Sequence, residues 1–120
     1  MRPEELKQRT KAFGLSVIEQ VNTLPMTKSA DVIGRQLLRA ATSVGANYRS
    51  ACRARSLADF VSKIGVAEEE ADESMYWLEL LCETHLVDSK RVEVLLKEAD
   101  ELTAILAASE KTARNHHRKT

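Results

Sequence analysis

The sequence is poor in residues that make turns and in large aromatic rings. Among its 120 residues are four glycines and two prolines, and only 4% are aromatic. Good helix formers, chiefly leucine, alanine, glutamate, lysine and arginine, therefore continue for long stretches without interruption. This composition predicts an all-α protein, and the length predicts one domain with a hydrophobic core of its own.

Long apolar runs are also missing. Nowhere do eighteen apolar residues follow one another, and the N-terminus lacks an apolar run with a small-residue cleavage site. We therefore expect a soluble, cytoplasmic chain with no membrane partner. The two cysteines, Cys52 and Cys82, fall in different predicted helices, and we expect both to be reduced thiols of the core.

The residue patterns of a catalytic centre are absent as well. Di-iron sites of helical bundles need Glu-x-x-His pairs, but the three histidines stand at His85, His116 and His117, away from the carboxylate run Glu68–Glu70. No cysteine has a histidine at a spacing that would indicate a catalytic Cys/His pair, and no glycine-rich phosphate loop occurs. The sequence predicts a protein that is not an enzyme and has no metal, cofactor or small-molecule substrate.

What the chain does have is an uneven distribution of charge. It holds 18 basic and 18 acidic residues, so its formal net charge is zero. Within 28–55, however, the only acidic residue is Asp31 among six basic ones, and within 56–84 the only basic residue is Lys63 among eight acidic ones. A basic segment is followed directly by an acidic one.

Apolar residues recur at spacings of three, four and seven over four segments, which predicts four amphipathic helices. The predicted helices cover about 4–24, 29–54, 57–84 and 89–109. Ser29, Ser56, and Asp88 or Ser89 are the expected N-caps. Gly45 lies inside the second helix, where it costs about 1 kcal/mol relative to alanine, so we expect a close helix crossing there.

Helices of this length, joined by short loops, can only run up and down beside one another. We therefore predict an antiparallel up-and-down four-helix bundle over residues 1–110. The final residues, 111–120, lose the apolar periodicity and carry several basic side chains. We expect them to form a disordered basic tail.

The arginines of the second helix share one side of it and form the most distinctive surface feature of the sequence. They are Arg35, Arg39, Arg49 and Arg53. Three interpretations are open: ion pairs with acidic residues of the third helix, inside a subunit or across a subunit boundary; contacts with phosphates of RNA or DNA; and plain solvation. The acidic candidates for such ion pairs are Glu69, Asp72 and Glu73. Additional phosphate contacts would come from Lys111, Arg114, Arg118 and Lys119.

Tyr76 and Trp77 are adjacent in the acidic third helix. Aromatic residues and arginine are enriched at the centres of protein interfaces, so the pair could anchor an interface between subunits. An ordinary core position is the alternative for Trp77.

Three stretches resemble one known family: GANY at 45–48, RARS at 53–56 and EADESMYWLE at 70–79. The chain is similar to the bacterial four-helix bundle proteins encoded in intervening sequences of 23S rRNA genes. More distantly it resembles the basic, pentameric accessory protein of diversity-generating retroelements. The resemblance implies a ring-shaped homo-oligomer, a homopentamer, without established enzymatic activity. The sequence thus favours a protein whose partner is itself, with binding of RNA or DNA as the alternative.

Overall fold

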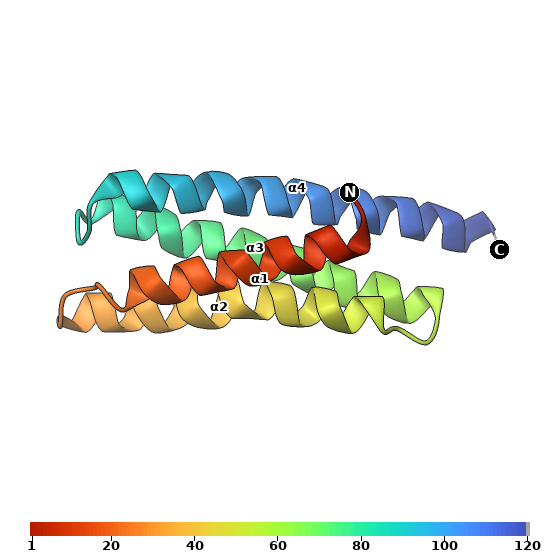
Figure 1. Ribbon diagram of the computed structural model, residues 1–120, viewed down its shortest axis with the longest axis horizontal. Coiled ribbons are helices and arrows are strands. Elements are labelled where there is room, and N and C mark those ends of the chain that lie inside the picture. Colours follow the sequence, from red (N-terminus) through yellow and green to blue (C-terminus); the bar gives the residue numbers. More distant parts are fainter. Residues whose placement is uncertain (120) are drawn as a thin grey trace.

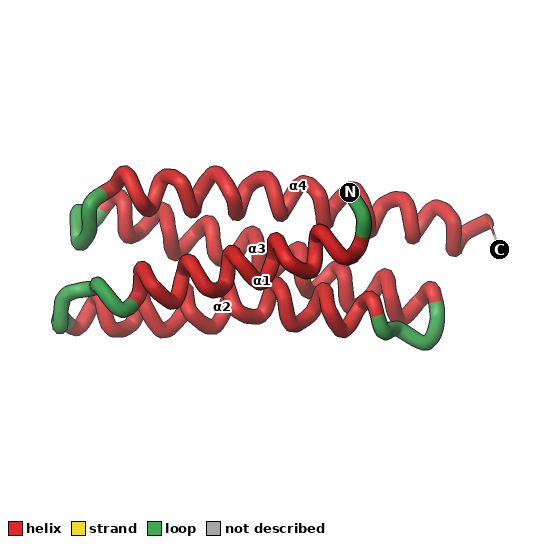
Figure 2. Tube along the Cα trace, viewed as in Figure 1, coloured by secondary structure: helices red, strands yellow, loops and turns green. Residues whose placement is uncertain are grey.

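The computed structural model describes residues 1–119, and over this range the chain is helical apart from three connecting loops and the first two residues (Figure 2). Its four helices are α1 (Pro3–Val21), α2 (Lys28–Cys52), α3 (Leu57–Glu83) and α4 (Ser89–Lys119). The all-α prediction is confirmed.

The helices run side by side as an elongated rod with principal extents of 52 × 21 × 20 Å (Figure 1). Each helix packs along the one that follows it in the chain, and α1 also touches α4. Within the described residues α1 and α3 do not contact each other, so they lie at diagonal corners of the bundle. This arrangement confirms the predicted antiparallel four-helix bundle.

The core consists of the apolar stripes of all four helices. All six residues that the periodicity of the second helix turns inward are buried: Ile33, Leu37, Ala40, Val44, Tyr48 and Ala51. Phe13 and Val17 of α1, together with Leu78 of α3 and Leu102 of α4, fill the space between these residues and the opposite helices. Burial of such side chains supplies about 1.5–3 kcal/mol each and holds the helices together.

The ends of the helices show how local polar groups set the boundaries. Ser56 Oγ accepts a hydrogen bond from the Asp59 backbone N–H (3.0 Å), and Asp88 Oδ1 accepts one from the N–H of Lys90 (3.1 Å). The second helix begins one residue before the predicted start, because Thr27 rather than Ser29 is its N-cap and accepts from the N–H of Ala30. His85 follows α3 with a positive φ of 58°, the left-handed conformation that ends many helices.

Two predicted helix ends lie further along the chain than the observed ones. The first helix ends at Val21 instead of residue 24, because Thr23 and Leu24 already bond back to Gln20 and Val21 in turns. The second helix ends at Cys52 instead of residue 54, where Arg53 and Ala54 form the same kind of turn.

Gly45 of α2 lies directly against the backbone of α1. A Cβ atom placed on Gly45 would come within 3.4 Å of the carbonyl carbon of Thr10. Thr10 is itself buried and turns its hydroxyl back to the carbonyl of Leu6 (2.9 Å), so it presents a compact surface to α2. The close crossing expected from a glycine inside a helix is therefore present.

The prediction of a disordered tail is wrong over the described residues. α4 continues through the predicted end at 109 to Lys119, and its last turns extend past the neighbouring helix ends (Figure 1). Arg114 donates to Glu110 one turn earlier (2.5 Å), a pairing that stabilises an exposed helix. The apolar periodicity ends near Ala108, but residues that favour helix continue beyond it. Thr120 lies outside the described residues.

Candidate interaction surfaces

The arginines of α2 divide into two pairs with different surroundings. Arg35 is bound to Asp31 one turn earlier (3.2 Å), and Arg39 donates to Glu70 (3.0 Å) and to Glu73 of α3. These two arginines therefore already have counterions inside the chain. The contacts of Arg39 also link α2 to α3, whereas the Arg35 pair stays within one helix.

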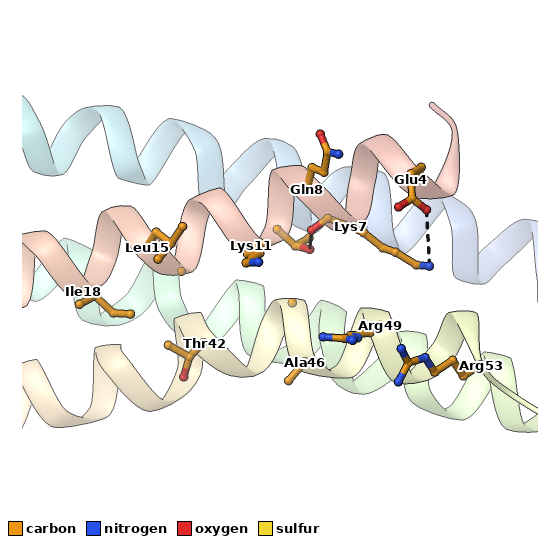
Figure 3. A pocket seen from close by; sticks show the side chains of 13 residues that line it. Glu4, Lys7, Gln8, Lys11, Leu15, Ile18, Thr42, Ala46, Arg49 and Arg53 are labelled. Carbon is orange, nitrogen blue, oxygen red and sulfur yellow. Dashed lines mark hydrogen bonds and ion pairs between the residues drawn. The ribbon is translucent and has the colours of Figure 1, made fainter.

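Arg49 and Arg53 lie instead beside a groove between α1 and α2, shown in Figure 3. The side chains of both have no ion pair with any residue of the described chain. The groove encloses about 550 Å³. It is lined by Glu4, Lys7, Gln8, Thr10, Lys11, Gly14, Leu15, Ile18, Thr42, Gly45, Ala46, Arg49 and Arg53. We call this feature the α1–α2 groove.

Two lysines of α1 add positive charge to the groove. Lys7 points from α1 toward α2 and pairs with Glu4 at 3.6 Å, while Lys11 has no ion pair within residues 1–119 (Figure 3). Neither lysine stands out in the sequence as a candidate site residue. Their spacing of four places them on one face of the first helix. That this face borders the arginines of α2 depends on how the two helices pack.

The far end of the groove is apolar. Leu15 and Ile18 of α1, which lie off the inward stripe of their helix, are 54% and 37% exposed. Small residues, among them Gly14 and Ala46, line the groove between this apolar end and the cations. A partner could therefore approach the two helices closely and contact apolar and charged groups together.

An acidic surface lies on α3 and α4. Glu68, Glu69 and Asp72 of α3 border a shallow hollow of about 410 Å³ together with Glu110 of α4. A hydrogen bond to Glu110, then burial, then repulsion from Glu110, Glu69 and Asp72 raise the pKa of Glu68. The pKa of Glu110 is instead lowered, chiefly by the hydrogen bond that Glu110 accepts from Arg114.

The raised pKa of Glu68 has a consequence for stability. Because the folded chain holds this proton more tightly than the unfolded chain, the contribution of Glu68 to stability is present at low pH and is lost as pH rises through the folded pKa. Glu68→Gln should therefore stabilise the protein at pH 7 by about 0.2–0.5 kcal/mol, the size of one repulsive pair such as Glu68–Asp72.

Urea unfolding at pH 7 and at about pH 4, the range where carboxyl groups titrate, tests this expectation. The gain in the free energy of unfolding that Glu68→Gln brings over the wild type should be smaller at the lower pH. Glu19→Gln serves as the control, because Glu19 is an exposed carboxylate without an ion pair among the described residues. Equal pH dependence in the two variants would contradict the role given to Glu68.

Tyr76 and Trp77 face different surroundings. Trp77 is half-buried against the core and donates its indole N–H to Glu73 (3.2 Å), the carboxylate that also binds Arg39. Tyr76 is 54% exposed, and its ring meets that of Trp77 edge-on with 5.0 Å between centroids. Of the two positions left open by the sequence, the structure places Trp77 against its own core and turns Tyr76 outward.

Acidic side chains surround Tyr76 on the outer side of α3. Glu69 and Asp72 precede it by seven and four residues, which puts them on the same side of the helix. Neither carboxylate forms an ion pair with the described residues, in contrast to Glu73. We call the surface formed by Glu69, Asp72 and Tyr76 the acidic face of α3.

The titratable groups of the interior do not form an activated nucleophile. Both cysteines are free in the structure and half-buried, so they lie at the edge of the core and not within it. Burial, followed by repulsion from Glu93, Glu83 and Glu79, raises the pKa of Cys82 and keeps its thiol protonated. Burial, with a hydrogen bond to Cys52, also raises the pKa of Tyr48. No group of three His, Cys, Asp or Glu side chains among residues 1–119 could hold a metal ion.

The basic residues predicted for the tail lie on the last turns of α4. Arg114 is paired with Glu110, whereas the exposed Lys111 and Arg118 form no ion pair within the described part of the chain. The side chain of Lys119 lies outside the described part. None of the helices in residues 1–119 is both long enough and apolar enough to span a membrane.

Comparison with known proteins places this architecture among its relatives. The sequence model of a family described as 23S rRNA-intervening sequence protein matches residues 4–108. The crystal structure of a protein of unknown function from the S23 ribosomal protein family of Bacteroides thetaiotaomicron is similar, with a TM-score of 0.85 and 32% sequence identity. The match covers 92% of this chain and 99% of that one. The comparison with curated proteins gave no match.

Proposed function

The chain belongs to the 23S rRNA-intervening sequence protein family, and we propose that it is a non-enzymatic protein that assembles with copies of itself into a ring. The main support is the separation of unpaired charge in a neutral chain. Cations without counterions border the α1–α2 groove, and carboxylates without counterions lie on the acidic face of α3. A second copy would neutralise both surfaces.

The two surfaces are unlike and belong to different sides of the bundle. Contacts between unlike surfaces join subunits head to tail, and such a series closes into a ring when the rotation between subunits allows it. The subunit number that we propose, five, rests on the resemblance of the sequence to ring-forming bundles. The free thiols Cys52 and Cys82 support a cytoplasmic location, because reducing compartments keep thiols unpaired.

Light scattering coupled to gel filtration tests this proposal. At about 50 mM salt, where surface charges act over roughly 10–15 Å, we expect the mass of a closed assembly of five chains of 13.4 kDa each. At about 1 M salt the screening length falls to about 3 Å, so the assembly should weaken. The mass of a single chain at every protein concentration would overturn the proposal.

Binding of RNA or DNA is a second candidate function, favoured by the end of α4. This segment extends beyond the neighbouring helices, and its Lys111 and Arg118 have no counterion among the described residues (Figure 1). Backbone phosphates would be the natural partners of such side chains.

Fluorescence anisotropy with labelled RNA and duplex DNA at about 50 mM salt tests this second candidate. Binding should fall steeply with salt, and Lys111→Glu combined with Arg118→Glu should weaken it for all sequences alike. Lys90→Glu combined with Lys97→Glu, an equal charge change near the start of α4, is the control. Absence of binding by the wild-type protein would dismiss this function.

A further inference from the structure

We propose that the α1–α2 groove of one subunit receives the acidic face of α3 of the next subunit, with Tyr76 inserted into the groove. This inference rests on the proposed assembly and specifies which surfaces meet. It makes each subunit an acceptor through its groove and a donor through α3. The neighbouring copy then completes a site that one chain alone leaves unfilled.

The groove has the shape and chemistry to accept an aromatic side chain between carboxylates. Its volume of about 550 Å³ falls within the range of pockets that bury small organic groups, about 300–1,000 Å³. Gly14, Gly45 and Ala46 line the groove and have little or no side chain, so a neighbouring helix can come close to the backbones of α1 and α2. Lys11 and Arg49 stand on opposite sides of the groove, on α1 and α2 (Figure 3), and both have no counterion in the described chain.

The acidic face of α3 supplies the complementary features. Tyr76 is 54% exposed, and an isolated chain leaves this large ring in contact with water on its outer side. Glu69 and Asp72 flank the ring and form no ion pair within residues 1–119. Cations also favour the face of an aromatic ring, so Arg49 would gain a further contact with Tyr76.

Electrostatics and topology exclude the simpler arrangements. Pairing the groove with itself would bring Lys11 and Arg49 against like charges, and pairing the acidic face with itself would do the same for Glu69 and Asp72. The groove belongs to α1 and α2 and the acidic face to α3, the helix diagonal to α1, so one chain cannot join the two surfaces. Nucleic acid in the groove would neutralise the cations but leave the carboxylates of α3 unpaired.

Two variants test the α1–α2 groove and the acidic face of α3 separately. The groove variant carries Lys11→Glu and Arg49→Glu, and the face variant carries Asp72→Ala and Tyr76→Ala. All four residues are exposed, so both variants should keep the helical circular dichroism of the wild type. Each variant alone should associate more than about tenfold more weakly than the wild type.

Mixing the variants gives the decisive result. In an equimolar mixture the intact face of the groove variant can occupy the intact groove of the face variant, but the chain of contacts cannot continue. Light scattering should therefore show two chains, one of each variant. Lys90→Glu with Lys97→Glu, an equal reversal on α4 outside both surfaces, should assemble like the wild type.

The outcomes are distinguishable. If the wild type is a single chain, the proposed assembly and this inference both fail. If the wild type assembles and either variant assembles equally well, or if the mixture stays as single chains, only the pairing of these two surfaces is overturned. Loss of RNA binding with an unchanged mass in the groove variant would assign the groove to nucleic acid and overturn the pairing as well.

Discussion

Trp77→Ala should lower the free energy of unfolding by about 2–3 kcal/mol, somewhat less than the 3–5 kcal/mol of a fully buried tryptophan. The indole ring packs against the core, and its N–H donates to Glu73, which also binds Arg39 of α2. Removing the ring leaves a cavity at the α2–α3 contact and deprives Glu73 of one of its two donors. Urea unfolding followed by circular dichroism measures the loss.

Tyr76→Ala is the matched control, one residue earlier on the same helix. Because its ring is 54% exposed and lies on the outer side of α3, its loss should change the stability of the subunit by no more than about 0.5 kcal/mol. Unfolding must be followed at several protein concentrations, since assembly adds to the apparent stability in a concentration-dependent way. Equal losses from both substitutions would mean that the two rings have equivalent surroundings.

Arg9→Met should lower the free energy of unfolding by about 1–2 kcal/mol, more than a surface ion pair provides. Arg9 on α1 donates to both carboxylate oxygens of Glu98 on α4 (2.8 and 2.7 Å) and to Glu101 (3.2 Å). It lies at the contact between α1 and α4, where an open groove of about 370 Å³ separates parts of the two helices. Methionine keeps most of the aliphatic length but removes all three bonds.

Arg2→Met provides the comparison for this effect. Arg2 also binds a carboxylate, that of Glu5 at 2.7 Å, but its side chain is 82% exposed and the pair stays within α1. Arg2→Met should lower the free energy of unfolding by less than about 0.5 kcal/mol. A loss from Arg9→Met no larger than this would show that apolar packing alone holds α1 to α4. Relative to the wild type, Arg9→Met should also speed up amide hydrogen exchange more in α1 than in α3.

Much of the fold could be predicted because burial follows the spacing of apolar residues within each helix. The six inward residues of α2 show this directly, since all of them are buried. The cap at Ser56 was equally predictable, because a hydroxyl three residues before an acidic side chain satisfies the first free N–H groups. The extent of α4 was not, since an exposed helix can continue on local pairs such as Glu110–Arg114 after its apolar stripe ends.

The candidate site was predictable only in part. The sequence places Arg39 and Arg49 on one side of a helix, but it does not say that α3 lies beside Arg39 while α1 lies beside Arg49. It also leaves Lys11 without context, because the groove exists only where α1 crosses α2. For the same reason Trp77, which lies at the flank of the apolar stripe of α3, could be assigned to the edge of the core only once the packing of the neighbouring helix was known.

The sequence by itself determined the helices, their inward stripes, the family, and the separation of basic from acidic segments along a neutral chain. These features depend on residues close together in the sequence, whose relative positions helical geometry dictates. Only the tertiary structure decided which arginines are already paired and which border the α1–α2 groove. That outcome depends on which segments, far apart in the chain, core packing brings side by side.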